Sequence, residues 1–88
     1  MKRKRVLAHG RVQGVFFRDS VRREASRAGV AGWARNNPDG TAEAVFEGGE
    51  EAVDRMVDYV RKGPGHAEVH DLEVHDEDPE GMQGFRIG

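Results

Sequence analysis

Residues 10–18 read GRVQGVFFR, with two glycines four positions apart, a pair of phenylalanines and an arginine. Apolar residues 6–8 precede this segment and an amphipathic helical pattern follows it, so we expect a loop between a strand and a helix. Glycine lets several backbone N–H groups turn toward one point, and a helix N-terminus adds partial positive charge there. Arg18 adds a permanent charge on a planar fork of donors that matches phosphate oxygens. The segment therefore predicts a site for a small phosphate-like anion.

Hydrophobic periodicity predicts the elements around this loop. Alternation of apolar and polar residues predicts strands over about 3–11, 30–35, 42–47, 72–75 and 85–87. Apolar residues at helical spacing predict helices over about 17–28 and 50–62. Asn37-Pro38-Asp39-Gly40 predicts a tight turn, which makes a hairpin of the second and third strands. This order predicts one domain over 1–88, a ferredoxin-like βαββαβ α+β sandwich with two helices on one face of an antiparallel sheet, plus a strand tail.

The predicted strand order brings two distant segments together. The first two strands are joined through a helix, so they run in the same direction and their C-terminal ends share one edge of the sheet. Arg18 follows the first strand and Asn36 ends the second, so we expect both at one site. A carboxamide both donates and accepts hydrogen bonds, and beside a phosphoryl group it can hold a water for in-line attack. Such a site works by positioning and charge stabilisation, which suits an already reactive phosphate ester or anhydride.

Two segments carry a family resemblance that covers essentially the whole chain. Residues 10–18 resemble the phosphate-loop signature of the acylphosphatases, and residues 32–36 (GWARN), followed by Gly40 and Gly48, resemble their second signature. The resemblance implies a hydrolase without metal or cofactor that cleaves the carboxyl–phosphate anhydride of small acyl phosphates and releases inorganic phosphate. It implies Arg18 and Asn36 as the catalytic residues, with Asn36 orienting the attacking water. The residues implied in phosphate binding are Gly10, Arg11, Val12, Gln13, Gly14, Val15, Phe16 and Arg18.

Three positions depart from the family pattern. Ala8 stands where a larger aliphatic residue is usual before the loop, and Ala42 stands where valine is usual on the third strand. We interpret both as packing changes that leave the chemistry alone. The chain ends at Gly88, and the sequence leaves open whether its carboxylate reaches Arg18, as a longer C-terminal end does in some relatives.

Composition excludes several classes of function. The 14 basic and 16 acidic residues give a net charge of −2, which argues against broad electrostatic binding of nucleic acid. No apolar run approaches the roughly 20 residues that span a bilayer, so no membrane partner is expected. With no cysteine, the chain fits a reducing cytoplasm, and we expect a monomer there. The basic run 2–5 and the acidic run 76–80 are interpreted as solvated chain ends.

Single residues carry weaker predictions. Phe17 matches the helical stripe and is predicted to be buried, whereas Phe16 is expected to pack under the loop. Trp33 is interpreted as packing on the sheet rather than as a ligand platform. His66 and His70 have helical metal-ligand spacing, but the glycine-rich turn before them and the missing partner ligands predict no metal site.

Two other functions remain open on the sequence. One is a binding module on the same fold, for RNA or a small ligand. RNA binding would need exposed aromatic residues on the first and third strands. The third strand instead offers Thr41, Glu43, Val45 and Glu47 on its outer face, and the two acids would repel RNA. The other is a regulatory or maturation domain detached from a larger enzyme; the initial methionine and the full set of elements favour an independent protein.

Overall fold

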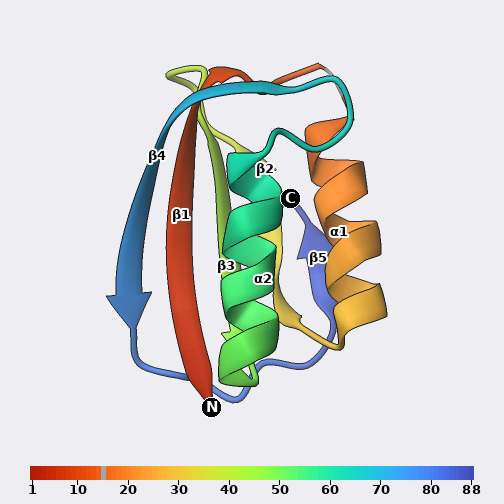
Figure 1. The fold of residues 1–88 in the computed structure, drawn as a ribbon, viewed down its shortest axis with the longest axis vertical. Coiled ribbons are helices and arrows are strands. Elements are labelled where there is room, and N and C mark those ends of the chain that lie inside the picture. Colours follow the sequence, from red (N-terminus) through yellow and green to blue (C-terminus); the bar gives the residue numbers. More distant parts are fainter. Residues whose placement is uncertain (15) are drawn as a thin grey trace.

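The computed structural model describes residues 1–14 and 16–88, and its elements follow the predicted order (Figure 1). The strands are β1 (Lys2–Arg11), β2 (Ala31–Asn36), β3 (Ala42–Gly48), β4 (Glu68–Glu77) and β5 (Phe85–Ile87). The helices are α1 (Phe17–Ala28), which ends at Gly29 in the left-handed conformation, and α2 (Glu50–Arg61). β4 is longer than predicted because it follows β1 along its whole length, from Arg3 opposite Glu77 to Arg11 opposite Glu68.

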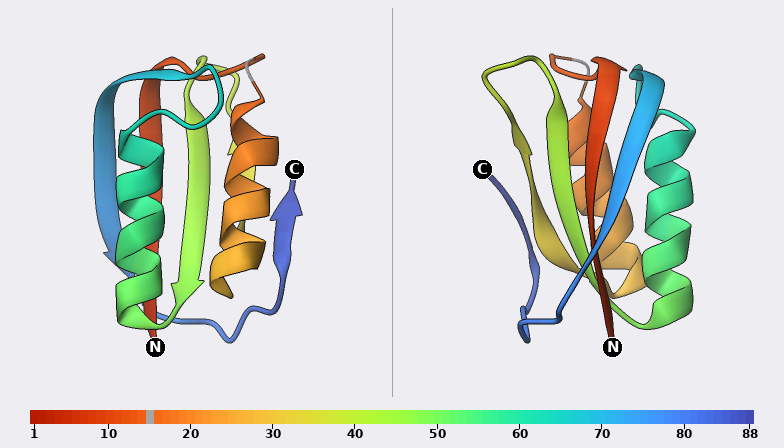
Figure 2. Two further views of the ribbon diagram at one scale, coloured as in Figure 1. Left: turned by 45° about the vertical axis from the view of Figure 1, so that its right-hand side comes forward. Right: turned by 90° about the vertical axis from the view of Figure 1, so that its left-hand side faces the viewer.

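The five strands form one sheet in the order β4-β1-β3-β2-β5. β1 pairs antiparallel with β3 and β4, and β2 pairs antiparallel with β3, as predicted. β5 corrects the prediction of a wholly antiparallel sheet, because it runs parallel to β2. The link after β4 crosses beneath the sheet and delivers β5 to the far edge, where it runs in the same direction as β2 (Figure 2). The sheet is therefore mixed.

Both helices cover one face of the sheet, and the core lies between the two layers (Figure 2). Phe17 is buried in this core, as predicted, and Phe46 stacks on Phe85 with ring centroids 5.9 Å apart. Ala8 and Ala42 are fully buried and lie opposite each other in the β1–β3 register. The two departures from the family pattern are therefore paired core positions. Within the described residues, neither helix is long and apolar enough to cross a membrane.

The outer face of the sheet corrects two predictions. The residues expected on the exposed outer face of the third strand are all buried: Thr41, Glu43, Val45 and Glu47. The interpretation of both charged runs as solvated ends is only partly right. Asp76, Asp78 and Glu80 are exposed, whereas Arg3 and Arg5 of the basic run pair with Glu77 over this face. Arg3 is only 5% exposed and contacts the carboxylates of Glu47 at 3.3 Å, Glu77 at 2.9 Å and Glu80 at 3.6 Å. The sequence pattern could not show this, since the pairing is across strands.

Glu47 also fixes the link that leads to β5. Its carboxylate accepts hydrogen bonds from the backbone N–H groups of Glu80, Gly81 and Met82, each at 2.8 Å. These bonds, led by that from Glu80 and joined by that from Arg3, hold the pKa of the Glu47 carboxyl below its usual range. The link is thereby held against the outer face, and it leads to β5, which pairs with residues 32–34 of β2.

Candidate active site

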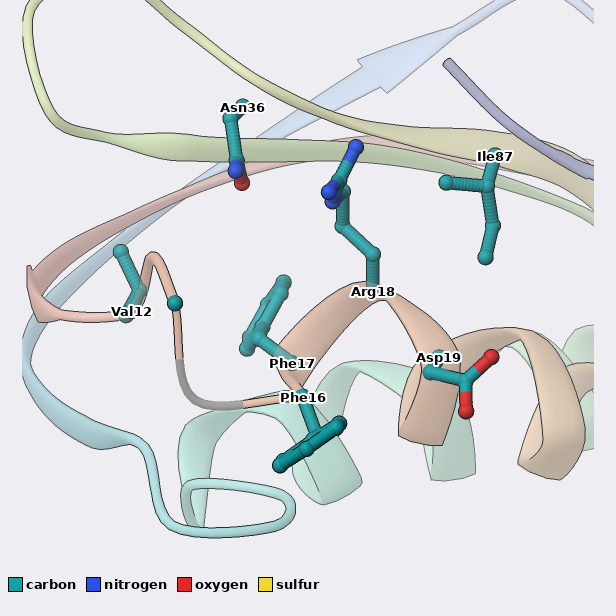
Figure 3. A pocket seen from close by; sticks show the side chains of 8 residues that line it. Val12, Phe16, Phe17, Arg18, Asp19, Asn36 and Ile87 are labelled. Carbon is teal, nitrogen blue, oxygen red and sulfur yellow. The ribbon is translucent and has the colours of Figure 1, made fainter.

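The first turn of α1 and the end of β2 enclose one pocket of about 330 Å³. Arg18 rises from the helix and Asn36 points down from the sheet, so their side chains face the same space (Figure 3). The sheet topology explains the meeting, since β1 and β2 run in the same direction. The residues that line the pocket are Val12, Gly14, Phe16, Phe17, Arg18, Asp19, Asn36 and Ile87.

Arg18 supplies the positive charge of the pocket. Its Nη1 donates to the oxygen of Gly88 at 2.6 Å, and the N–H of Gly88 in turn donates to the carbonyl of Ala34 at 2.8 Å. Gly88 thus continues the line of β5 alongside β2, and its oxygen lies within hydrogen-bond distance of Arg18. No carboxylate side chain among residues 1–14 and 16–88 forms an ion pair with Arg18. The guanidinium therefore remains suited to an oxyanion ligand.

Asn36 supplies an acceptor with no partner. Its Oδ1 is buried, and no hydrogen-bond donor within the described part of the chain reaches it. A buried polar atom without a partner costs about 1–3 kcal/mol, so the fold tolerates such atoms mainly where a ligand or water satisfies them. An acceptor of this kind, facing the same space as Arg18, is suited to hold a water beside a bound anion.

The loop contributes to the pocket through part of its length. Val12, Gly14 and Phe16 line the pocket, whereas the side chain of Gln13 points to the β2–β3 turn. Gly14 and Phe16 both have left-handed backbone conformations, with φ of 71° and 61°. Loops with left-handed residues can turn successive N–H groups toward one anion. Val15, also predicted to bind phosphate, lies outside the described residues.

Gly10 and Arg11 belong to β1 and lie outside the pocket lining. Gly10 has φ of 129°, and a Cβ at this position would come within 2.3 Å of the Glu68 carbonyl oxygen on β4. This glycine is therefore required by strand packing at the irregularity between His9 and Gly10. The Arg11 side chain is 70% exposed and lies 4.0 Å from Glu68.

Phe16 contradicts the prediction that it packs under the loop. Its side chain is 73% exposed and points away from Arg18 and Asn36 (Figure 3). The next residue, Phe17, begins α1 and takes the core position instead. Phe16 precedes the helix in a left-handed conformation that non-glycine residues rarely adopt. The sequence carries no signal for this, because the pattern only excludes that both rings face the same way.

Three pocket residues were not predicted as site residues, and one of them, Phe17, was predicted only as part of the core. Ile87 enters the pocket because β5 lies beside β2, a parallel pairing that periodicity does not reveal. Asp19 also lines the pocket, and its carboxylate accepts hydrogen bonds from Arg22 at 2.9 Å and Arg23 at 3.3 Å. Figure 3 shows Asp19 directed away from Arg18, so it does not compete with an anion there.

The residues with other predicted roles lie elsewhere. Trp33 is half-buried, and the Arg35 guanidinium lies 4.9 Å from its ring centroid, which fits packing on the sheet. His9 contacts Glu73 at 2.6 Å across β1 and β4. In the described ranges, no three histidine or acidic side chains are placed to hold a metal ion.

In sequence and in structure, the chain is similar to known proteins of one family. Residues 4–87 match the acylphosphatase family model. The chain is 55% identical to an acylphosphatase of Rubrobacter xylanophilus, over 98% of this chain and 79% of the relative. It is 52% identical to an acylphosphatase of Thermococcus kodakarensis, over 96% and 97%. The crystal structure of acylphosphatase from Bacillus subtilis superposes with a TM-score of 0.95 at 38% identity, covering 100% of this chain and 99% of that one. The chain therefore belongs to the acylphosphatase family, and its activity is the hydrolysis of small acyl phosphates to a carboxylate and inorganic phosphate.

Proposed function

We propose that the pocket binds the phosphoryl group of an acyl phosphate between Arg18 and the loop of residues 12–17, and that Asn36 orients the attacking water. The observation that carries the proposal is the buried Asn36 Oδ1, which lacks a donor within residues 1–14 and 16–88 and faces the same space as Arg18. In this arrangement Oδ1 accepts a hydrogen bond from the water and so directs a lone pair of the water oxygen at phosphorus.

The reaction then proceeds as an in-line displacement. The water oxygen forms a bond to phosphorus while the bond from phosphorus to the acyl oxygen breaks. The electron pair leaves with the carboxylate, and the water gives up one proton to the phosphate product or to solvent. A carboxylate is a stable leaving group, so the step does not depend on a general acid. Neither Arg18 nor Asn36 transfers a proton in this step.

Arg18 is assigned the electrostatic stabilisation of the transition state. Negative charge spreads over the equatorial oxygens of the phosphoryl group in the transition state, and a positioned guanidinium stabilises it. Backbone N–H groups near Gly14 and Phe16, together with the N-terminus of α1, add donors on the other side of the group. Positioning and charge stabilisation together suffice for an anhydride, which is already reactive.

The proposal also includes the oligomeric state, the location and the partners of the protein. Residues 1–88 act as a single domain and as a monomer in the cytoplasm, without metal, cofactor, nucleic acid or membrane partner. The small molecules that it is proposed to bind are the acyl phosphate and its two products, the carboxylate and inorganic phosphate. The addition of EDTA is therefore expected to leave turnover unchanged.

The test compares the parent protein with Asn36→Ala, following benzoyl phosphate by ultraviolet absorbance with EDTA present. We expect turnover in the parent to fall at least about 100-fold in the variant, the scale seen when one positioned polar group is removed from an active site. The inhibition constant of inorganic phosphate should change by less than about threefold, since Arg18 and the loop remain. Equal loss of turnover and phosphate affinity would contradict the assigned role of Asn36. No turnover in the folded parent would favour a binding module on this fold.

A further inference from the structure

Gln13 forms a bridge between two segments that are far apart in the sequence. Its side-chain Nε2 donates to the carbonyl oxygen of Asn37 at 2.8 Å and to that of Thr41 at 2.9 Å. Both acceptors are backbone carbonyls, so only the amide nitrogen, with its two protons, can satisfy them. The bridge therefore fixes the orientation of the Gln13 side chain, which is half-buried and lies outside the pocket lining.

The turn that Gln13 holds is already built without it. The N–H of Asn37 donates to Thr41 O at 2.9 Å, and the N–H of Gly40 donates to Asn37 O at 3.1 Å. The Asp39 carboxylate accepts from the N–H and the hydroxyl of Thr41, at 3.0 and 2.7 Å. Asn37 Nδ2 also donates to Thr41 Oγ1 at 3.0 Å. Five internal hydrogen bonds therefore close the turn, and the Gln13 contacts add only its attachment to the loop.

The two ends of the bridge lie next to the two halves of the site. Gln13 stands between Val12 and Gly14, which line the pocket, and Asn37 directly follows Asn36. The bridge thus joins the segment that is proposed to bind phosphate to the segment that is proposed to orient water. Helix α1 and the sheet provide the remaining connection between the halves, through the core.

We propose that Gln13 is a positioning residue, which fixes the distance between the phosphate-binding loop and Asn36. The inference rests on the proposed function, since it acts through the water held by Asn36. In-line attack needs the water oxygen about 3–3.5 Å from the reacting atom, and a displacement of about 1 Å can cost about 100-fold in rate. The backbone of the loop still provides its N–H groups without the bridge, so binding of phosphate depends on Gln13 far less than turnover does.

The experiment measures kcat on benzoyl phosphate and the inhibition constant of inorganic phosphate for Gln13→Ala. We expect kcat to fall about 10- to 100-fold, with the inhibition constant changed by less than about threefold. Asp39→Ala is the matched control, because it removes two hydrogen bonds from the same turn and none from the bridge. We expect it to lower Tm by an amount similar to that of Gln13→Ala while keeping kcat within about twofold. If both variants lower kcat in proportion to their loss of Tm, Gln13 is merely structural and the inference is wrong.

A second pair of variants separates the bridge from the role of Asn36. Because Gln13 is proposed to act through Asn36, adding Gln13→Ala to Asn36→Ala should lower the residual rate, measured at high enzyme concentration, by less than about threefold. A full 10- to 100-fold further loss would overturn the inference while leaving the proposed function intact. If instead Asn36→Ala alone keeps full turnover, the proposed function fails first, and the positioning role fails with it. Gln13→Glu, of similar volume but without the two protons, should lose at least as much kcat as Gln13→Ala.

Discussion

Arg3 and Arg18 show two uses of the same side chain in one small molecule. Arg3 lies under the link on the outer face of the sheet, 5% exposed, and contacts three carboxylates. Arg18 lies at the start of α1 and lines an open pocket, where its described hydrogen bond goes to the oxygen of Gly88. Arg3 is thus paired with acidic side chains of the fold, whereas Arg18 has one described hydrogen bond and keeps further guanidinium N–H donors at the pocket.

The difference shows what makes a basic residue functional. Both arginines adjoin connecting segments, the link to β5 in one case and the loop that is proposed to bind phosphate in the other. Arg3 is matched by acidic groups of the same chain, so it contributes to stability and has no capacity left for an anion. Arg18 forms no ion pair with a carboxylate side chain in residues 1–14 and 16–88, which leaves donors for the anion that is proposed to bind there. Each of the following variants tests one side of this comparison.

The largest expected effect is on turnover, from Arg18→Gln. Removing a guanidinium that neutralises transition-state charge on a phosphoryl group costs about 10³- to 10⁵-fold in kcat in related chemistry, and we expect at least 10³-fold here. The inhibition constant of phosphate should rise as well, because ground-state charge pairing is also lost. Tm should stay within a few degrees of the parent.

Arg22→Gln is the matched control for this variant. Arg22 lies one turn further along α1, is half-exposed and is paired with Asp19 at 2.9 Å. Turnover in Arg22→Gln should remain within about twofold of the parent, since exposed helix pairs contribute little. Comparable losses in Arg18→Gln and Arg22→Gln would mean that the general positive charge of α1, rather than the placement of Arg18, attracts the substrate.

The next effect is on stability, from Glu47→Gln. Removing one charge of a buried pair costs about 3 kcal/mol, and here the link to β5 also loses carboxylate acceptors for three N–H groups. The free energy of unfolding should be measured by urea titration, with Glu24→Gln as the control. Glu24 pairs with Arg27 at 3.3 Å on the exposed side of α1, so its loss should cost less than about 1 kcal/mol. If both variants lower the free energy of unfolding by the same amount, the ion pairs of Arg3 with Glu47, Glu77 and Glu80 contribute no more than an exposed ion pair does.

The sequence predicts the core side of this fold better than its outer face. Alternation and helical spacing locate each element, because they report which side of an element is buried against the helices. They assign Glu43 and Glu47 to solvent because an acidic residue opposite a core position is usually exposed. Periodicity within one strand cannot show that β1 and β2 supply the partners of Glu43, or that β1 and the link supply those of Glu47. The same limit explains the parallel pairing of β5, which depends on the path of the link.

The sequence likewise predicts one part of the candidate site and misses another. Arg18 and Asn36 are predicted to meet because strand direction follows from the order of the elements, and the structure brings them to one pocket. Residue type alone could not show that the two glycines of the loop have different roles. Gly10 is required because β4 approaches its backbone closely, whereas Gly14 lines the pocket. The bridge from Gln13 was also hidden, because its acceptors are backbone carbonyls that any residue would present.

The smallest expected effect is the response to acid. The pKa of Glu47 is lowered chiefly by the N–H of Glu80, and the pKa of Glu77 is lowered chiefly by its hydrogen bond from Arg3. The folded state therefore binds fewer protons than the unfolded state in this range. The resulting stability is complete above the ordinary carboxyl pKa of 4.5 and is lost as the pH falls through the lowered values.

Unfolding by urea at about pH 7 and about pH 3.5 measures this loss, and two variants locate its origin. Glu47→Gln lacks one of the titrating carboxyls, so it should lose less stability than the parent between the two pH values. Arg18→Gln should lose as much as the parent, because the described hydrogen bond of Arg18 goes to Gly88 and not to Glu47 or Glu77. Identical acid dependence in all three proteins would show that the carboxylates around Arg3 do not govern acid stability. The charges of Arg3 and Arg18 would then be less distinct in function than their surroundings indicate.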